Sequence, residues 1–211
     1  MKKKILSSVI ILVALVFVSS TLSEDHPILK VGKKAPLSDL KMKNIDGSQH
    51  SLASLTKENG LLVVFSCNTC PFVVGGNDFP GWEKDYNKIY QECKKNNIGM
   101  VLINSNEAKR EGDDAPDKME AHAKEKGYEM PYLVDKNHVL ADAFGAKTTP
   151  HIFLFDKDLK LIYTGSIDNT WDGKRSEDEN YLLDAFTNIS EGKKIKITTS
   201  SPRGCSIKRV K

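Results

Sequence analysis

The chain has 211 residues, of which 39% are hydrophobic and 28% are charged. This length and composition predict one domain with a packed core, and they give no indication of disorder. The formal net charge is only +3, and the positive residues form no basic stripe with interleaved aromatic side chains. Nucleic acid is therefore not an expected partner.

The N-terminal segment has the layout of a secretory signal peptide. Three lysines at positions 2–4 precede a nearly continuous apolar run, 5–18, and small residues follow up to Ser23. We expect residues 1–23 to be a signal peptide, with an uncleaved membrane anchor as the alternative. Export would place the mature chain in an oxidising compartment, the periplasm or cell envelope of a bacterium. Contact with a membrane is expected only if this segment is retained.

The first part of the mature chain leads to a buried strand. Residues 24–34 are polar and are predicted to be a short tether. Asp46-Gly47 predicts a hairpin, and a short helical turn near 51–57 follows. The uninterrupted apolar run at the start of 61–66 then predicts a strand that is buried on both faces of a sheet.

Two cysteines, Cys67 and Cys70, follow this strand directly. A pair with this spacing, between a buried strand and a helical pattern, indicates a redox-active dithiol. We expect the helix N-terminus to point at the Cys67 sulfur and to favour its thiolate. We also expect Cys67 to be the exposed sulfur and Cys70 to be shielded within the first helical turn. Half of a zinc site is the alternative, but Cys93 and Cys205 form no second pair of this kind.

The middle of the chain alternates helical and extended patterns. Apolar residues recur at steps of three and four from Phe79 to Cys93, which predicts a helix with Pro80 near its start and Cys93 on its buried face. Four further segments are expected in order: a buried strand at 98–104, a charged loop at 107–114, a helix at 116–127, and a short extended stretch at 131–135.

The last part of the chain predicts an antiparallel strand pair and a final helix. A short helix at 139–144 is followed by Thr149-Pro150, which opens a strand at 151–156, and a turn leads to a second strand at 159–164. Ser176 and Glu179 form a capping-box pattern, so the final helix is expected to begin there. The β-α-β unit around the dithiol requires parallel strands and a right-handed crossover. A mixed sheet with helices on both faces is the result.

This order of elements resembles the thioredoxin fold and, more closely, thioredoxin-like proteins of the AhpC/TSA (redoxin) type. The matching segments are 32–36, 46–47, 67–73, 103–106, 149–156 and 204–208. The resemblance implies an α/β thioredoxin-like domain over 24–211, with a central mixed sheet, an N-terminal β-hairpin extension and a C-terminal tail from about residue 198. It also implies that Cys67 attacks the substrate disulfide, that Cys70 resolves the mixed disulfide that results, and that Pro150 is a cis-proline facing the dithiol.

The resemblance implies a thiol–disulfide oxidoreductase that acts on exported proteins. The Cys67 thiolate would form a mixed disulfide, and Cys70 would then release the reduced substrate. The expected partners are disulfide- or thiol-bearing proteins and an unidentified electron donor or acceptor, with no cofactor and no resident metal. One alternative is a peroxiredoxin-like peroxide reductase, although no arginine lies in the nearby segment. The other is a copper- or zinc-binding module that uses Cys67, Cys70 and His151.

Three positions leave questions that the pattern does not decide. Thr69 stands where close relatives often carry a histidine, so the pattern does not fix the reduction potential of the Cys67–Cys70 pair. His151 is expected to be a solvated or core-edge residue, with a general base as the alternative. Cys205 lies in the polar tail near Lys208 and Arg209, whose charges favour a thiolate. We favour a non-catalytic Cys205, because two cysteines suffice for exchange, with a third redox thiol as the alternative.

Overall fold

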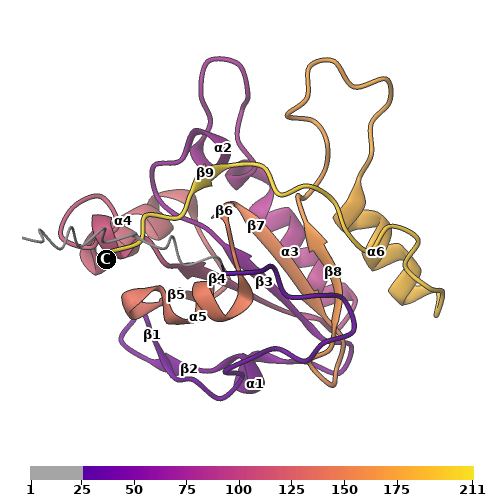
Figure 1. Ribbon diagram of the computed structural model, residues 1–211, viewed down its shortest axis with the longest axis horizontal. Helices are drawn as coiled ribbons and strands as arrows, with labels where there is room; N and C mark the ends of the chain where they lie inside the picture. Colours follow the sequence, from indigo (N-terminus) through magenta and orange to yellow (C-terminus); the bar gives the residue numbers. More distant parts are fainter. Residues whose placement is uncertain (1–25) are drawn as a thin grey trace, which may run out of the picture.

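A computed structural model describes residues 26–211, so the expected signal peptide lies outside the described residues. Within this range the main sheet has seven strands in the order β2-β1-β5-β4-β3-β7-β8 (Figure 1). These strands are β1 (Met42–Asn44), β2 (Gln49–His50), β3 (Leu61–Phe65), β4 (Gly99–Asn104), β5 (Tyr132–Val134), β7 (His151–Phe155) and β8 (Leu161–Gly165). A second, two-stranded sheet consists of β6 (Thr148–Thr149) and β9 (Cys205–Ser206).

The helices are mostly short. The α-helices are α1 (Leu52–Leu55), α2 (Pro71–Val74), α3 (Tyr86–Lys95), α4 (Pro116–Lys126), α5 (Val139–Phe144) and α6 (Tyr181–Ser190). Three 3₁₀ turns are η1 (Glu83–Asp85), η2 (Glu107–Lys109) and η3 (Lys136–His138). In the part of the chain that is described, none of the helices combines the length and the apolar character needed to span a membrane.

Strand β3 is the centre of the sheet. All five of its residues are buried, as the apolar run predicted. It pairs in parallel with β4 and antiparallel with β7, so that Leu61 lies between Gly99 and Phe155. Strands β7 and β8 form the expected antiparallel pair. The carboxyl end of β3 therefore emerges at the middle of one sheet edge, and this is where the two cysteines follow.

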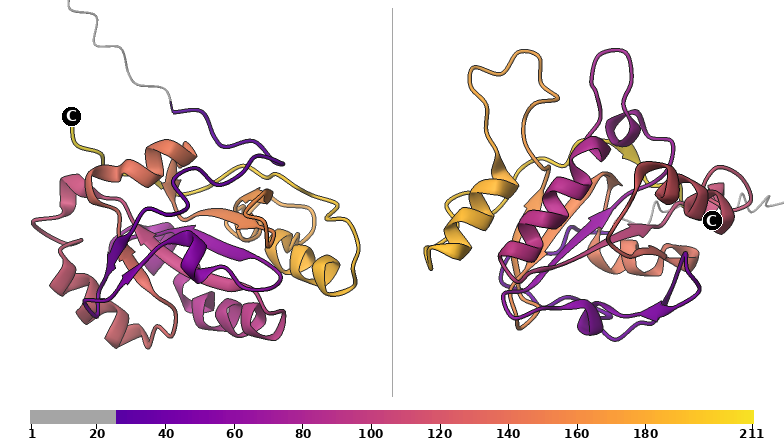
Figure 2. Two further views of the ribbon diagram at one scale, coloured as in Figure 1. Left: turned by 90° about the horizontal axis from the view of Figure 1, so that it is seen from below. Right: turned by 180° about the vertical axis from the view of Figure 1, so that it is seen from behind.

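Helices cover both faces of the sheet, as predicted. Cys93 of α3, Met119 of α4 and Phe186 of α6 belong to one apolar cluster. Leu52 of α1 and Phe144 of α5 belong to the cluster on the opposite face. The view from behind shows α3 and α6 lying across the first of these faces (Figure 2). The sheet is thus buried on both sides, which explains why its central strands are apolar throughout.

The final helix has Asn180 as its N-cap in place of Ser176, so it begins four residues later than the capping-box pattern predicted. Helix α6 starts at Tyr181, and the residues before it form a loop that projects from the molecule (Figure 1). Glu179 does not cap the helix because the loop itself engages this residue. Its backbone N–H donates to the Asn169 side chain at 2.9 Å, and its carboxylate accepts from the Tyr181 hydroxyl at 2.6 Å.

The helix after the dithiol is split into two parts. Helix α2 ends at Val74, and α3 begins only at Tyr86, well after the predicted start near Pro80. Between them, Gly75 and Gly81 adopt positive φ angles of 99° and 75°, which glycine reaches without strain. A side chain at Gly81 would lie 2.3 Å from backbone atoms of the same loop. The glycines therefore permit a tight loop where a continuous helix would otherwise run.

Candidate functional site: a dithiol covered by the C-terminal tail

The dithiol lies at the carboxyl end of β3, where the chain turns into α2. Helix α2 begins at Pro71, and Cys70 is its N-cap residue. Proline suits the first helical position because that position needs no N–H donor. Helix α2 therefore begins directly after Cys70, and Cys70 rather than Cys67 is its N-cap. That the helix N-terminus points at the Cys67 sulfur stays a prediction.

The loop that contains Pro150 lies against both sulfurs. The Thr149–Pro150 peptide bond is cis, as the resemblance implied. The Thr149 hydroxyl is 3.1 Å from the Cys67 sulfur, and in its thiol form Cys70 donates to the Thr149 carbonyl oxygen at 2.9 Å. Thr149 thus contacts both cysteines, although it is about eighty residues away in the sequence. The sequence analysis identified Pro150 but not the residue before it.

Neither sulfur is open to solvent. Cys67 is 2% exposed and Cys70 is 4% exposed, so the prediction that Cys67 is the exposed thiol is wrong. The C-terminal tail folds back over the dithiol and provides the cover (Figure 1). Its strand β9 pairs antiparallel with β6, with Cys205 opposite Thr149. The Cys205 backbone N–H donates to the Cys70 sulfur at 3.3 Å.

Hydrogen bonding distributes the negative charge unequally over the two sulfurs. The Cys67 thiol donates to Cys70, and this lowers the pKa of Cys70 to about 5, with the Cys205 thiol and backbone N–H as further donors. The same bond, together with burial, raises the pKa of Cys67 well above its usual range. With the tail in place, these contacts therefore favour a thiolate on Cys70 over one on Cys67.

Cys205 carries no thiolate near neutral pH. Burial and its hydrogen bond to Cys70 raise the pKa of Cys205 to about 11, and only Lys208 acts in the opposite direction. The expectation of a thiolate favoured by two cations is therefore wrong. Arg209 does not take part because its guanidinium bonds to the Asp142 carboxylate at 2.7 Å and to the Ala146 carbonyl oxygen at 2.8 Å.

A buried carboxylate fixes the inner side of the dithiol loop. The Asp114 side chain accepts hydrogen bonds from the Asn68 backbone N–H at 3.0 Å, from the Asn104 side chain at 2.7 Å and from the Asn106 side chain at 3.0 Å. Asp114 is fully buried, and these donors compensate for its lost hydration. No sequence signal marks this residue, because its segment is charged and has no periodicity.

The same network holds the tail. The Asn106 side-chain oxygen accepts from the Lys208 backbone N–H at 2.8 Å, and the Lys208 carbonyl oxygen accepts from the Ala108 N–H at 2.9 Å. Ile207 is buried in the apolar cluster of the α1/α5 face. The tail is therefore anchored directly after Ser206, and Asn106 links it to the carboxylate beneath the dithiol.

His151 takes no part in the site. It is fully buried on β7, where its Nδ1 accepts from the Lys147 backbone N–H at 3.2 Å and its Nε2 lies 3.3 Å from the Thr164 hydroxyl. Burial lowers its pKa to about 3, so it is neutral at physiological pH. The expectation of a solvated or core-edge histidine is wrong, because the ring packs against Phe153 inside the sheet.

The contacts of His151 also remove the support for a copper or zinc site built from Cys67, Cys70 and His151. Among residues 26–211, no group of three or more histidine, cysteine or acidic side chains is arranged to hold a metal ion.

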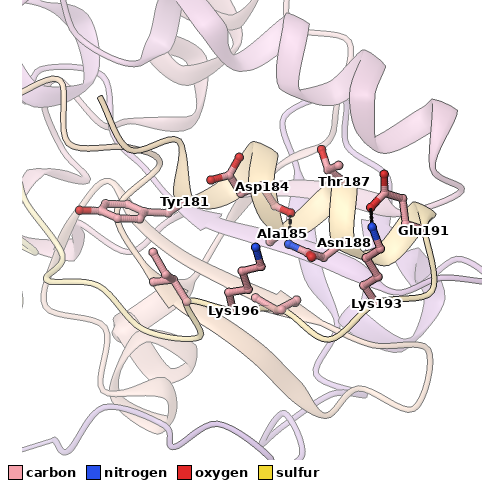
Figure 3. Close-up of a pocket in the computed structure, with 10 residues that line it drawn as sticks. Tyr181, Asp184, Ala185, Thr187, Asn188, Glu191, Lys193 and Lys196 are labelled. Carbon is pink, nitrogen blue, oxygen red and sulfur yellow. Dashed lines mark hydrogen bonds and ion pairs between the residues drawn. The ribbon is translucent and has the colours of Figure 1, made fainter. Parts of the chain in front are cut away.

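A cavity of about 600 Å³ lies away from the dithiol, along α6 and the segment that follows it (Figure 3). Its lining includes Asp184, Lys196 and an ion pair of 2.8 Å between Lys193 and Glu191. No cysteine or histidine lines it. This cavity therefore contributes no thiol or imidazole to the dithiol site.

The fold and the site together define a thioredoxin-like protein, with a dithiol between the central strand and a short helix and a cis-proline loop beside it. The model of the Redoxin family matches residues 30–182. The chain belongs to this family. Membership supports an oxidoreductase activity. A search of curated proteins found no match.

Solved structures agree with this assignment. An uncharacterized conserved protein from Geobacillus kaustophilus is 29% identical, with a TM-score of 0.76, over 86% of this chain and 93% of that one. A hypothetical protein from Sinorhizobium meliloti 1021 is also 29% identical, with a TM-score of 0.76, over 87% and 97% of the two chains. The thioredoxin domain of a thiol-disulfide oxidoreductase from Bacteroides vulgatus is similar in fold, with 15% identity and a TM-score of 0.53 over 78% and 98%.

Proposed function

We propose that this protein is a thiol–disulfide oxidoreductase that exchanges electrons with exported proteins through Cys67 and Cys70. One observation carries the proposal: both sulfurs contact Thr149 beside the cis Thr149–Pro150 bond, Cys67 at the hydroxyl (3.1 Å) and Cys70 at the carbonyl oxygen (2.9 Å). Two cysteines of one CxxC pair that are held against the same residue can close a disulfide with little movement of the backbone. A substrate disulfide can be reduced, or a substrate dithiol oxidised, at the same pair.

The reductive cycle uses the two cysteines in turn. A proton shift along the Cys67–Cys70 hydrogen bond gives a Cys67 thiolate, to which the Thr149 hydroxyl can donate. This thiolate attacks a substrate disulfide, forms a mixed disulfide and releases one substrate thiolate. Cys70, protonated by that shift, gives its proton to the released substrate thiolate and then attacks the Cys67 sulfur. The second substrate thiol leaves, and an electron donor must reduce the Cys67–Cys70 disulfide.

Trapping experiments test the order of attack. Cys70→Ser should accumulate mixed disulfides with substrate proteins, because the resolving thiolate is absent, and Cys67→Ser should not. Non-reducing electrophoresis followed by mass spectrometry identifies the trapped species. Trapping through Cys70 alone would reverse the two roles, and trapping by neither variant would remove the proposed activity.

Export is the part of the proposal that rests on the sequence pattern of residues 1–23. It would give the dithiol access to proteins that carry disulfides in the periplasm or cell envelope. N-terminal sequencing of the protein from cells should show a mature chain that starts after about residue 20. An intact terminus in the membrane fraction would indicate an anchor instead.

A peroxide reductase is the second candidate, and the ionisation of Cys70 favours it. A Cys70 thiolate could attack a peroxide and become a sulfenic acid, and Cys67 could then condense with it to a disulfide and water. Arg110, however, is held by the carbonyl oxygens of Asp114 and Asn104, at 2.8 Å each. A peroxide-consumption assay separates the candidates: rapid turnover that depends on Cys70 would favour the peroxidase.

A further inference from the structure

Cys70 has two cysteine neighbours, not one. The Cys205 backbone N–H donates to its sulfur at 3.3 Å, and the thiols of Cys67 and Cys205 both lower the pKa of Cys70. Cys205 is also the only member of this trio that is not fully buried. The dithiol cycle described above uses Cys67 and Cys70 and gives Cys205 no role.

Cys205 is held in this position by secondary structure. In the β6–β9 pair, Thr149 lies opposite Cys205 and Thr148 lies opposite Ser206. Adjacent residues of a strand point to opposite faces, so Cys205 faces the dithiol and Ser206, which is exposed, faces away. The anchoring of Ile207 and Lys208 keeps this register.

We propose that Cys205 is a third redox thiol that forms an alternative disulfide with Cys70. This inference rests on the proposed dithiol function. In the oxidised protein, the Cys205 thiolate attacks the Cys70 sulfur of the Cys67–Cys70 disulfide. The Cys70–Cys205 bond forms, the Cys67–Cys70 bond breaks, and the electron pair leaves on Cys67, which takes up a proton. Cys205 loses its proton to solvent, so the exchange needs no oxidant or reductant.

Oxidation of the dithiol itself prepares Cys205 for this attack. In the reduced protein, burial raises the pKa of Cys205 most, and the hydrogen bond to Cys70 and the charge on Cys70 raise it further. A Cys70 sulfur in a disulfide carries no charge, so this contribution is lost while the lowering effect of Lys208 remains. The product has a free Cys67 and a tail that is covalently fixed over the site.

The test uses Cys67→Ser, which leaves Cys70 and Cys205 as the only pair in contact at the site. Oxidised glutathione should first form a mixed disulfide with Cys70, and Cys205 should then displace glutathione. An internal thiol competes at millimolar or higher effective concentration, so glutathione-bound Cys70 should be at least about ten-fold less abundant than in Cys67→Ser/Cys205→Ser. Peptide mapping by mass spectrometry should find a Cys70–Cys205 link.

A matched control moves the cysteine by one residue. In Cys67→Ser/Cys205→Ser/Ser206→Cys, the tail still carries one cysteine, but on the face that points away from the dithiol. This variant should retain glutathione on Cys70 and give no link to the tail. Equal linking of positions 205 and 206 would show that a flexible tail, not the β9 register, brings the thiols together, and would overturn the inference.

A second variant keeps both cysteines and lifts the tail. A Cβ atom on Gly204 would lie 2.2 Å from the Thr149 carbonyl oxygen, so Gly204→Ala in the Cys67→Ser background should abolish most of the Cys70–Cys205 link. Gly173→Ala is the control, because no atom lies within 4 Å of the added Cβ. Circular dichroism checks that each variant is folded.

The outcomes separate this inference from the proposed function. Reduction of a protein disulfide by the wild type, with a reversible Cys67–Cys70 disulfide, tests the function alone. If that disulfide forms and no Cys70–Cys205 link appears in Cys67→Ser, the inference fails and the function stands. If Cys67→Ser forms the link but the wild type reduces no disulfide, the function fails.

Discussion

Cys70 and Cys93 are both buried, yet their surroundings have opposite effects on ionisation. Cys93 lies on the apolar face of α3, and burial raises its pKa well above the usual range. Cys70 is also buried, but hydrogen-bond donors from Cys67 and Cys205 lower its pKa to about 5. Burial therefore does not decide whether a cysteine is reactive; the donors that face its sulfur do.

The largest expected effect contrasts these two cysteines directly. Cys70→Ser should reduce disulfide-reductase turnover by at least about 10³-fold, because the thiol that resolves the mixed disulfide is lost. Cys93→Ala should retain most of the activity and cost about 1 kcal/mol of stability through the small cavity it leaves. Insulin reduction and urea unfolding measure the two effects. A comparable loss of activity in folded Cys93→Ala would contradict the contrast.

The next effect concerns the donors that the tail supplies to Cys70. The ultraviolet absorbance of the thiolate should appear as pH rises through about 5 in the reduced wild type. Gly204→Ala should move this midpoint upward, toward the ordinary cysteine value, because removal of the Cys205 donors makes the thiolate less favourable.

Two control titrations assign the absorbance change. Cys70→Ser should lose the transition near pH 5, and Gly173→Ala should leave its midpoint unchanged. An unchanged midpoint in Gly204→Ala would show that Cys67 alone sets the ionisation of Cys70.

A smaller loss of stability and turnover is expected when the Asp114 carboxylate beneath the dithiol loop is changed. Asp114→Asn replaces one acceptor oxygen by an amide group, which would face the donor of Asn106. An unsatisfied buried donor costs about 1–3 kcal/mol, and the shift of Asn68 should lower turnover several-fold. Asp113→Asn is the control, because the Asp113 side chain is exposed and only its carbonyl oxygen contacts the loop. Urea unfolding of both variants measures the difference.

Much of the fold could be predicted from local pattern. The apolar run of β3, the parallel β3–β4 pair and the β7–β8 hairpin follow from hydrophobicity and turn residues. The starts of α3 and α6 could not be predicted, because they depend on a glycine-bearing loop and on hydrogen bonds between distant residues. Local propensity describes neighbours in the chain, and these boundaries depend on neighbours in space.

In the site, too, features set by local sequence could be predicted, and features set by contacts between distant residues could not. The CxxC spacing identified the dithiol, and the resemblance identified Pro150. The exposure of Cys67 and the ionisation of Cys205 were predicted wrongly, because both depend on where the tail lies. Asp114 and Thr149 were missed for a related reason: their contacts with the dithiol loop span 46 and 79 residues. Spacing alone contains no information on such contacts.

The smallest expected effect concerns the Thr149 hydroxyl, which lies 3.1 Å from the Cys67 sulfur. Thr149→Val removes this hydroxyl and preserves the shape of the side chain, so the Cys67 thiolate loses one donor. A single hydrogen bond of this kind contributes about 1 kcal/mol, which corresponds to a roughly five-fold slower attack on a substrate disulfide. Thr149→Ser keeps the hydroxyl and should restore most of the rate. Stopped-flow measurement of mixed-disulfide formation, in a Cys70→Ser background, isolates this step from resolution. If the serine variant slows the attack and the valine variant does not, the packing of the methyl group, not the hydroxyl, would be responsible, and Thr149 would act on Cys70 through its carbonyl oxygen alone.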